Sequence, residues 1–345
     1  MFLRNQWYAA ARGGEVGRSL LRRKILNEPI VMYRTLDGQV AAIEDRCCHR
    51  HVPLSIGKLV EDRVQCAYHG LEFDRRGCCV YAPGQEKLSA NARVKAYVAV
   101  EKWQLVWLWM GDPERADESL IPDFSVTEQP GWAALGETLH LDCNYLLAID
   151  NLLDLSHIAY VHARTIGTID VARTPVQTVR EGDAVIVSRW MQDVPPPPMF
   201  VKLGGFTGNI DRWQIARAAA PCYVWLDVGG AAVGTGALEG RRDHAFRRWN
   251  LNCITPETET SSHLFWTEVR NFGLDDPAVG ESLRAQMALT LAEDAEVLAM
   301  QQQAILDNPD APEIDISFDA GAIRFRRMIE RKLAEQEAQA ISART

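Results

Sequence analysis

The chain has 345 residues, 47% of them hydrophobic, which is typical of two domains with an ample core. Its net charge of −9 argues against nucleic acid or an acidic membrane as the main partner, although a local arginine could still bind an anionic small molecule. No signal-peptide core opens the sequence and no apolar run approaches a membrane span, so we expect a cytoplasmic protein without a membrane partner. The eight cysteines are adjacent or scattered, which suits a reducing compartment.

The first third of the chain is predicted to form a small β domain. The strands expected there are residues 29–34, 39–45, 96–101 and 104–110. The first two are joined across Asp37-Gly38, which is a hairpin signal. Gly111-Asp112-Pro113 then ends this domain, so we predict domains at residues 1–115 and 116–345.

Two loops of the first domain each offer one cysteine and one histidine. The first loop contains Cys47 and His49 as C-x-H, and the second contains Cys66 and His69 as C-x-x-H. This is the ligand set of a Rieske [2Fe–2S] centre, in which one iron holds two cysteines and the other two histidines. Four such ligands could also hold a structural zinc ion. The number of cysteines and histidines is compatible with both a Rieske cluster and a zinc site.

The rest of the chain is predicted to place helices on one side of an antiparallel sheet, which is an α+β layer. The expected strands are residues 184–191, 213–227, 246–255 and 263–272. Helices are expected at residues 150–162 and 277–307. The stretch 194–208 contains four prolines in a row and is expected to be a loop.

A second group of candidate ligands lies on the first of these helices. Asn151, Asp154 and His157 follow one another at i, i+3 spacing and share one side of a helix, and His162 follows five residues later. The two histidines are about 140° apart on an ideal helix. They can reach one ion only if the helix kinks or widens, as at a π-bulge. A lone histidine on an apolar helix is more often a core residue, but two with an aspartate in register indicate a metal site.

The carboxylate of a 2-His-1-carboxylate iron site must then come from elsewhere in the chain. The helix at 277–307 has an apolar stripe of Leu283, Met287, Leu291 and Leu298. Asp294 falls inside this stripe, and a buried carboxylate is costly unless it is paired or bound to a metal. Its neighbours Glu293 and Glu296 are expected to be solvated charges. The alternative is that Asp294 forms a buried salt bridge or that the helix register differs.

The two motifs in this order resemble the large subunit of Rieske non-haem iron oxygenases. The resemblance is greatest to the branch of vanillate and dicamba O-demethylases and toluenesulfonate methyl-monooxygenase. It covers nearly the whole chain, with supporting runs at residues 5–10, 107–113 and 255–259. It implies an N-terminal all-β Rieske domain followed by a helix-grip catalytic domain with an antiparallel sheet.

The resemblance also implies roles for the candidate residues. The cluster ligands would be Cys47, His49, Cys66 and His69. The ligands of a mononuclear Fe(II) would be His157, His162 and Asp294. Asp154 would bridge the two metal sites across a head-to-tail homotrimer interface. Asn252 stands where dicamba demethylase has a histidine that contacts substrate.

The implied activity is a monooxygenase that uses O₂ to oxidise a methyl or methoxy group of an aromatic compound. Electrons would come from a separate NAD(P)H-dependent reductase or ferredoxin, since the chain lacks the G-x-G-x-x-G spacing of a dinucleotide site. O-dealkylation, N-dealkylation and methyl hydroxylation all stay open. The alternatives are a ring cis-dihydroxylating Rieske oxygenase, and an Fe–S electron-transfer or zinc protein without oxygenase activity.

Overall fold

The computed structural model describes residues 1–162 and 174–342, and the chain forms two compact units. The first unit contains Phe2–Pro122 together with the short segment Thr255–Thr258. The second contains Met1, Asp123–Ile254 and Glu259–Thr345. Within the described residues, no helix combines the length and the apolar character that crossing a membrane requires.

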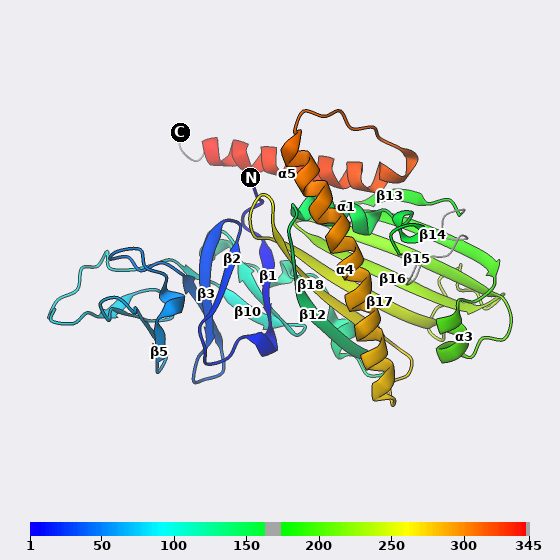
Figure 1. The fold of residues 1–345 in the computed structure, drawn as a ribbon. Coiled ribbons are helices and arrows are strands. Elements are labelled where there is room, and N and C mark those ends of the chain that lie inside the picture. The colour runs from blue at the N-terminus through cyan, green and yellow to red at the C-terminus, as the bar shows by residue number, and fades with distance from the viewer. Residues whose placement is uncertain (163–173, 343–345) are drawn as a thin grey trace. The chain divides into compact units, whose positions relative to one another are not determined.

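The first unit is all-β, as predicted, and contains three antiparallel sheets (Figure 1). One sheet has the order β1-β11-β10, with β1 at Trp7–Arg12, β11 at Leu105–Trp109 and β10 at Ala99–Lys102. The second has the order β2-β3-β4-β9, at Leu21–Ile25, Glu28–Arg34, Val40–Glu44 and Ala96–Tyr97. The third has the order β5-β6-β7-β8, at Lys58–Val60, Arg63–Gln65, Glu72–Phe73 and Cys79–Tyr81.

The predicted hairpin across Asp37-Gly38 is confirmed, since β3 pairs with β4. The strand expected at 96–101 is instead two short strands, of which β9 pairs with β4 and β10 pairs with β11. The turn between β10 and β11 consists of Trp103 and Gln104, which both have positive φ, as a two-residue turn that follows the strand twist requires. Gly38 supplies the positive φ of the other turn at little steric cost.

The second unit is built on one seven-stranded antiparallel sheet with the order β12-β18-β17-β16-β15-β14-β13. Strands β13 to β18 follow one another as a meander, and the last of them, β18, pairs with β12, the first strand of the unit. Their bounds are β12 Ala133–Leu141, β13 Gln177–Glu181, β14 Ala184–Val194, β15 Ile210–Ala219, β16 Tyr223–Ala232, β17 Phe246–Pro256 and β18 Ser262–Arg270.

Three helices pack beside this sheet: α1 at Tyr145–Leu153, α4 at Pro277–Asp307 and α5 at Ala320–Ser342. Figure 1 shows α4 lying across the sheet, and α4 contacts both α1 and β12. Asp276 caps the start of α4 by accepting a hydrogen bond from the backbone N–H of Ala278, and Pro277 occupies the first turn, where its missing N–H is not needed. The predicted bounds of this helix are confirmed.

Three predicted elements of the second unit differ from the structure. The strand expected at 213–227 is two strands, β15 and β16, because the chain reverses at Pro221, whose ring nitrogen cannot donate to a sheet. The loop expected at 194–208 contains the short helix α3 at Pro198–Gly204, which begins on the last of the four prolines. The helix expected at 150–162 is α1, which starts earlier and ends at Leu153.

Candidate metal centres

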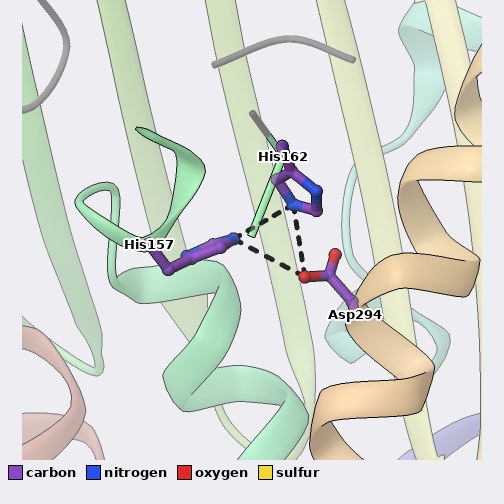
Figure 2. A group of neighbouring side chains, drawn as sticks. All are labelled: His157, His162 and Asp294. Carbon is purple, nitrogen blue, oxygen red and sulfur yellow. Dashed lines mark hydrogen bonds and ion pairs between the residues drawn. The ribbon is translucent and has the colours of Figure 1, made fainter. Parts of the chain in front are cut away.

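The second unit brings together the three residues predicted to bind a mononuclear metal. The Nε2 atoms of His157 and His162 lie 3.2 Å apart. Oδ1 of Asp294 lies 3.2 Å from Nε2 of His162 and 3.6 Å from Nε2 of His157, and Figure 2 shows the three side chains pointing to one place. Across the described residues, this is the one group of three or more His, Cys, Asp or Glu donors that all lie within 4.8 Å of one another. Two imidazoles and one carboxylate are the facial triad that suits non-haem iron.

The two histidines meet because helix α1 ends at Leu153, before both of them, and not because a continuous helix kinks or widens. Asp154 follows the last residue of α1 in an extended conformation, with φ −85° and ψ 94°. Its Oδ1 accepts a hydrogen bond from the backbone N–H of Ser156 at 2.7 Å. An aspartate side chain that captures a nearby N–H competes with the helix, so the chain turns here. His157 then begins a short 3₁₀ turn, and His162 lies beyond it.

A buried arginine holds this turned segment in place. Arg189 on β14 donates to the backbone carbonyl of Leu155 at 2.7 Å and lies 3.4 Å from the hydroxyl of Ser156. Its side chain is almost fully buried. Arg189 therefore fixes the backbone from which His157 projects, and nothing in its sequence neighbourhood points to that role.

Each histidine is oriented through its other ring nitrogen. Nδ1 of His157 hydrogen-bonds the backbone carbonyl of Asp154, which directs Nε2 toward Asp294. Burial lowers the pKa of His157, so its imidazole is neutral and able to bind a metal. Burial also acts to lower the pKa of His162, but the carboxylates of Asp294 and Glu293 outweigh it and raise that pKa. The same two carboxylates favour a metal cation at this point.

Glu293 is part of the site, so its prediction as a solvated charge is wrong. It is buried, and its Oε2 lies 3.0 Å from Nδ1 of His162. Glu296 is exposed, as predicted. The apolar stripe predicted the buried position of Asp294. Glu293 lies beside that stripe, and it is buried only because His162 packs against it. Asn151 also contributes, since its amide donates to Oδ1 of Asp294 at 3.1 Å.

A cavity opens beside the three donor atoms within the same unit. Its volume is about 100 Å³. Apolar side chains from α1, the 3₁₀ turn after it, α4 and the sheet line much of it, including Leu152, Ile158, Leu226 and Met287. The sheet also contributes polar side chains, among them Arg212, Arg248 and Glu268. Mostly apolar walls with a few polar groups are typical of a small-molecule site.

The predicted substrate contact Asn252 is fully buried and lies outside the lining of this cavity. Its amide donates to Oδ1 of Asn250 at 2.6 Å. Asn250 itself lines the cavity, two residues earlier on the same face of β17. Asn252 therefore lies behind Asn250 and does not itself line the cavity.

The two cysteine- and histidine-bearing loops of the first unit share one backbone pattern. In each loop the cysteine N–H donates to the carbonyl five residues later, from Cys47 to Val52 at 2.9 Å and from Cys66 to Leu71 at 2.8 Å. The cysteine carbonyl accepts from the residue four positions on, which is His51 in one loop and Gly70 in the other. Both of those residues have positive φ. The loops are thus two copies of one turn.

The four predicted cluster ligands meet as two pairs. The thiols of Cys47 and Cys66 are buried side by side, and burial raises the pKa of Cys47 to about 11. The rings of His49 and His69 are exposed, with centroids 4.7 Å apart. A tetrahedral zinc site would bring all four donors within about 4 Å of one another, given metal–ligand distances of about 2.0–2.3 Å. The four donors do not form such a group. A [2Fe–2S] centre needs only a pair of cysteines on one iron and a pair of histidines on the other.

Comparisons with known proteins agree with both centres. Residues 6–98 match the Rieske [2Fe-2S] domain, and residues 141–335 match the vanillate O-demethylase oxygenase C-terminal domain. The chain is 39% identical to the iron-sulfur subunit of a toluene-4-sulfonate monooxygenase system of Comamonas testosteroni, over 96% of this chain and 97% of that protein. It is 36% identical to the oxygenase component of dicamba O-demethylase of Stenotrophomonas maltophilia, over 98% and 99%. A crystal structure of dicamba monooxygenase bound to 3,6-dichlorosalicylic acid superposes with a TM-score of 0.90 at 35% identity, covering 98% and 99% of the two chains.

Proposed function

The chain belongs to the Rieske non-haem iron oxygenases, in the branch of the toluenesulfonate, vanillate and dicamba monooxygenases, and we propose that it oxidises a methyl or methoxy group of an aromatic compound. Its cofactors are a Rieske [2Fe–2S] cluster and a mononuclear iron at a His-His-Asp site. The observation that carries the proposal is the group His157, His162 and Asp294, which borders a largely apolar cavity. Hydroxylation of an O-methyl or N-methyl carbon there would give an unstable hemiacetal or carbinolamine that releases formaldehyde.

The chain's own residues prepare the metal site for this reaction. When bound, the iron activates O₂ with electrons that arrive through the cluster. Glu293 and the carbonyl of Asp154 hold the two imidazoles, and Asn151 holds Asp294. Three protein donors leave open positions for O₂ beside the substrate. The apolar walls of the cavity limit the water that reaches the reacting carbon.

We propose Cys47, His49, Cys66 and His69 as the cluster ligands. The exposed rings of His49 and His69 support this assignment, because electrons must leave the unit at a surface that a neighbouring subunit can approach. In a head-to-tail homotrimer, Asp154 would bridge His69 of one subunit and a ligand histidine of the next. Electrons would enter from a separate reductase or ferredoxin.

Ring cis-dihydroxylation could use the same iron ligands. Methyl or methoxy oxidation is favoured because the likeness to toluenesulfonate, vanillate and dicamba enzymes covers 96–98% of the chain. The alternative of an electron-transfer or zinc protein without oxygenase activity is wrong, since the oxygenase domain and its donor group are both present.

A product screen tests the proposal. The holoenzyme, supplied with a flavin and Fe–S reductase and NADH, is incubated with methoxybenzoates, toluenesulfonate and N-alkyl anilides. Formaldehyde or a benzylic alcohol is the expected product, and NADH without the reductase should give no turnover. A cis-diol as the main product would overturn the assignment in favour of ring dihydroxylation.

A further inference from the structure

Arg189 on β14 donates hydrogen bonds to the chain on both sides of the two histidine ligands. Before the ligands, its Nη1 donates to the backbone carbonyl of Leu155 at 2.7 Å. After them, its Nε donates to the backbone carbonyl of Thr174 at 3.0 Å. In the sequence, His157 and His162 lie between these two acceptors. One side chain therefore ties together the two flanks of the stretch that supplies both imidazoles.

Two longer contacts link Arg189 to the cavity wall and to the turn after α1. Its Nη1 lies 3.4 Å from Oε1 of Gln214, and its Nη2 lies 3.4 Å from the hydroxyl of Ser156. Arg189 and Gln214 stand opposite each other in the pairing of β14 with β15. Gln214 and Leu155 both line the cavity. The guanidinium thus lies between the metal-binding segment and the wall of the cavity.

The four oxygens that these contacts use are all neutral, although Arg189 carries a charge and is only 1% exposed. Burying a cation in this way is costly, and burial lowers the pKa of Arg189, while the charge of the Asp154 carboxylate acts to raise that pKa. An apolar side chain of similar size would pack here without that cost. What only a guanidinium offers is a rigid planar fork that holds several acceptors at fixed angles. The contacts of Arg189 therefore indicate a role in geometry.

The geometry that Arg189 controls is that of one peptide group. The carbonyl of Leu155 and the N–H of Ser156 belong to the same peptide group, and Arg189 holds its oxygen. The side chain of Asp154 holds its N–H at 2.7 Å. The backbone carbonyl of Asp154 in turn hydrogen-bonds Nδ1 of His157. If the peptide group were free to rotate, the acceptor that orients His157 would move with it.

We infer that Arg189 is a positioning residue of the iron site, which sets the orientation of His157 by fixing the peptide group after Leu155 and by joining the two flanks of the ligand segment. Gln214 aligns the guanidinium from the cavity wall. The inference rests on the metal site of the proposed function and not on its substrate. A failure to release formaldehyde from any aromatic compound would therefore count against the proposed function and leave this inference standing.

Iron affinity tests the inference without turnover. Catalytic iron is removed from the holoprotein with a chelator, and Fe(II) is titrated back with the Rieske absorption of the same sample as the internal standard. Arg189→Ala should bind Fe(II) roughly 10- to 100-fold more weakly, which is the usual effect of losing a group that orients a ligand histidine. The matched control is Arg247→Ala. Arg247 pairs with Asp227 at 2.7 Å, and its side chain alternates with that of Arg248, so it points to the sheet face away from the cavity. This control should lower the unfolding temperature and leave the iron affinity unchanged.

A second variant and a spectroscopic measurement guard against misfolding. Arg189→Lys keeps the charge but lacks the planar fork, so its iron affinity should fall between those of the wild type and Arg189→Ala. The electron paramagnetic resonance spectrum of the nitric oxide adduct of the bound Fe(II) reports the symmetry of its ligands. It should change in both Arg189 variants and stay unchanged in Arg247→Ala. The inference is overturned if both Arg189 variants keep the wild-type affinity, if they weaken iron binding no more than Arg247→Ala does, or if their spectra match that of the wild type.

Discussion

Replacing Glu293 tests how strongly the carboxylate behind His162 supports the metal site. Glu293→Gln keeps the size of the side chain and an oxygen that can accept from Nδ1 of His162, which lies 3.0 Å away, but it removes the negative charge. Glu293→Ala removes both the charge and the acceptor. The two side chains are only 2% and 8% exposed, so solvent screens this interaction little.

The size of the effect follows from that burial. A hydrogen bond to a charged group contributes about 1.5–3 kcal/mol, against about 1 kcal/mol for a neutral pair. Glu293→Gln should therefore cost about 0.5–2 kcal/mol of iron binding, or roughly a 3- to 30-fold weaker affinity. Glu293→Ala should cost roughly 10- to 100-fold, the usual effect of losing a carboxylate behind a ligand histidine.

The assay is iron titration of chelator-treated protein, with the Rieske absorption of the same sample as the internal standard. Formaldehyde release should fall in the same order, from wild type to Glu293→Gln to Glu293→Ala. Glu296→Gln is the control, because Glu296 is an exposed acid three residues along the same helix. If all three variants keep the wild-type iron affinity, or if Glu296→Gln does the same damage, then Glu293 does not support the metal.

Three further predictions concern the metal ligands and the link between them. Asp294→Asn removes the negative charge of a direct ligand, so it should lose more catalytic iron than Glu293→Gln while the Rieske spectrum stays intact; equal iron content in both would show that Asp294 is not a ligand. Cys66→Ala should abolish the Rieske spectrum and the acid-labile sulfide without unfolding the second unit, and stoichiometric zinc in the wild-type protein would contradict this. Asp154→Asn should load both metals but slow single-turnover product formation by at least about tenfold, since an amide has one acceptor oxygen where the carboxylate has two. A wild-type rate in that variant, with a stability change of only a few tenths of a kcal/mol, would reduce Asp154 to a structural residue of the turn after α1.

The parts of the fold that the sequence predicted well depend on local patterns. The apolar stripe of α4 is a property of one helix, so both its bounds and the buried position of Asp294 could be predicted from spacing alone. The hairpin between β3 and β4 depends on one Asp-Gly turn, and it was predicted from that turn. In the same way, each cluster loop is one short turn with its cysteine and histidine close together in the chain.

The parts that were predicted wrongly depend on competition or on distant partners. Helix α1 ends at Leu153 because the Asp154 side chain takes the N–H of Ser156, and hydrophobic periodicity contains no trace of that hydrogen bond. Glu293 is buried against His162, which is 131 residues away in the sequence. Spacing along α4 could show only that Glu293 lies off the apolar stripe, not what packs beside it.

The same distinction separates the class of reaction from the choice of substrate. The proposed ligands of both metal centres lie in compact motifs, apart from Asp294, and their chemistry indicates an iron-dependent oxygenase. The cavity wall is instead assembled from β15 to β18, where the alignment of neighbouring strands decides which side chains meet. Arg248 and Glu268 become a pair only through that alignment, and Asn250 lines the cavity where Asn252 does not. Which side chains line the cavity wall therefore depends on the register of the sheet, and one residue of slip would turn Arg248 to the opposite face.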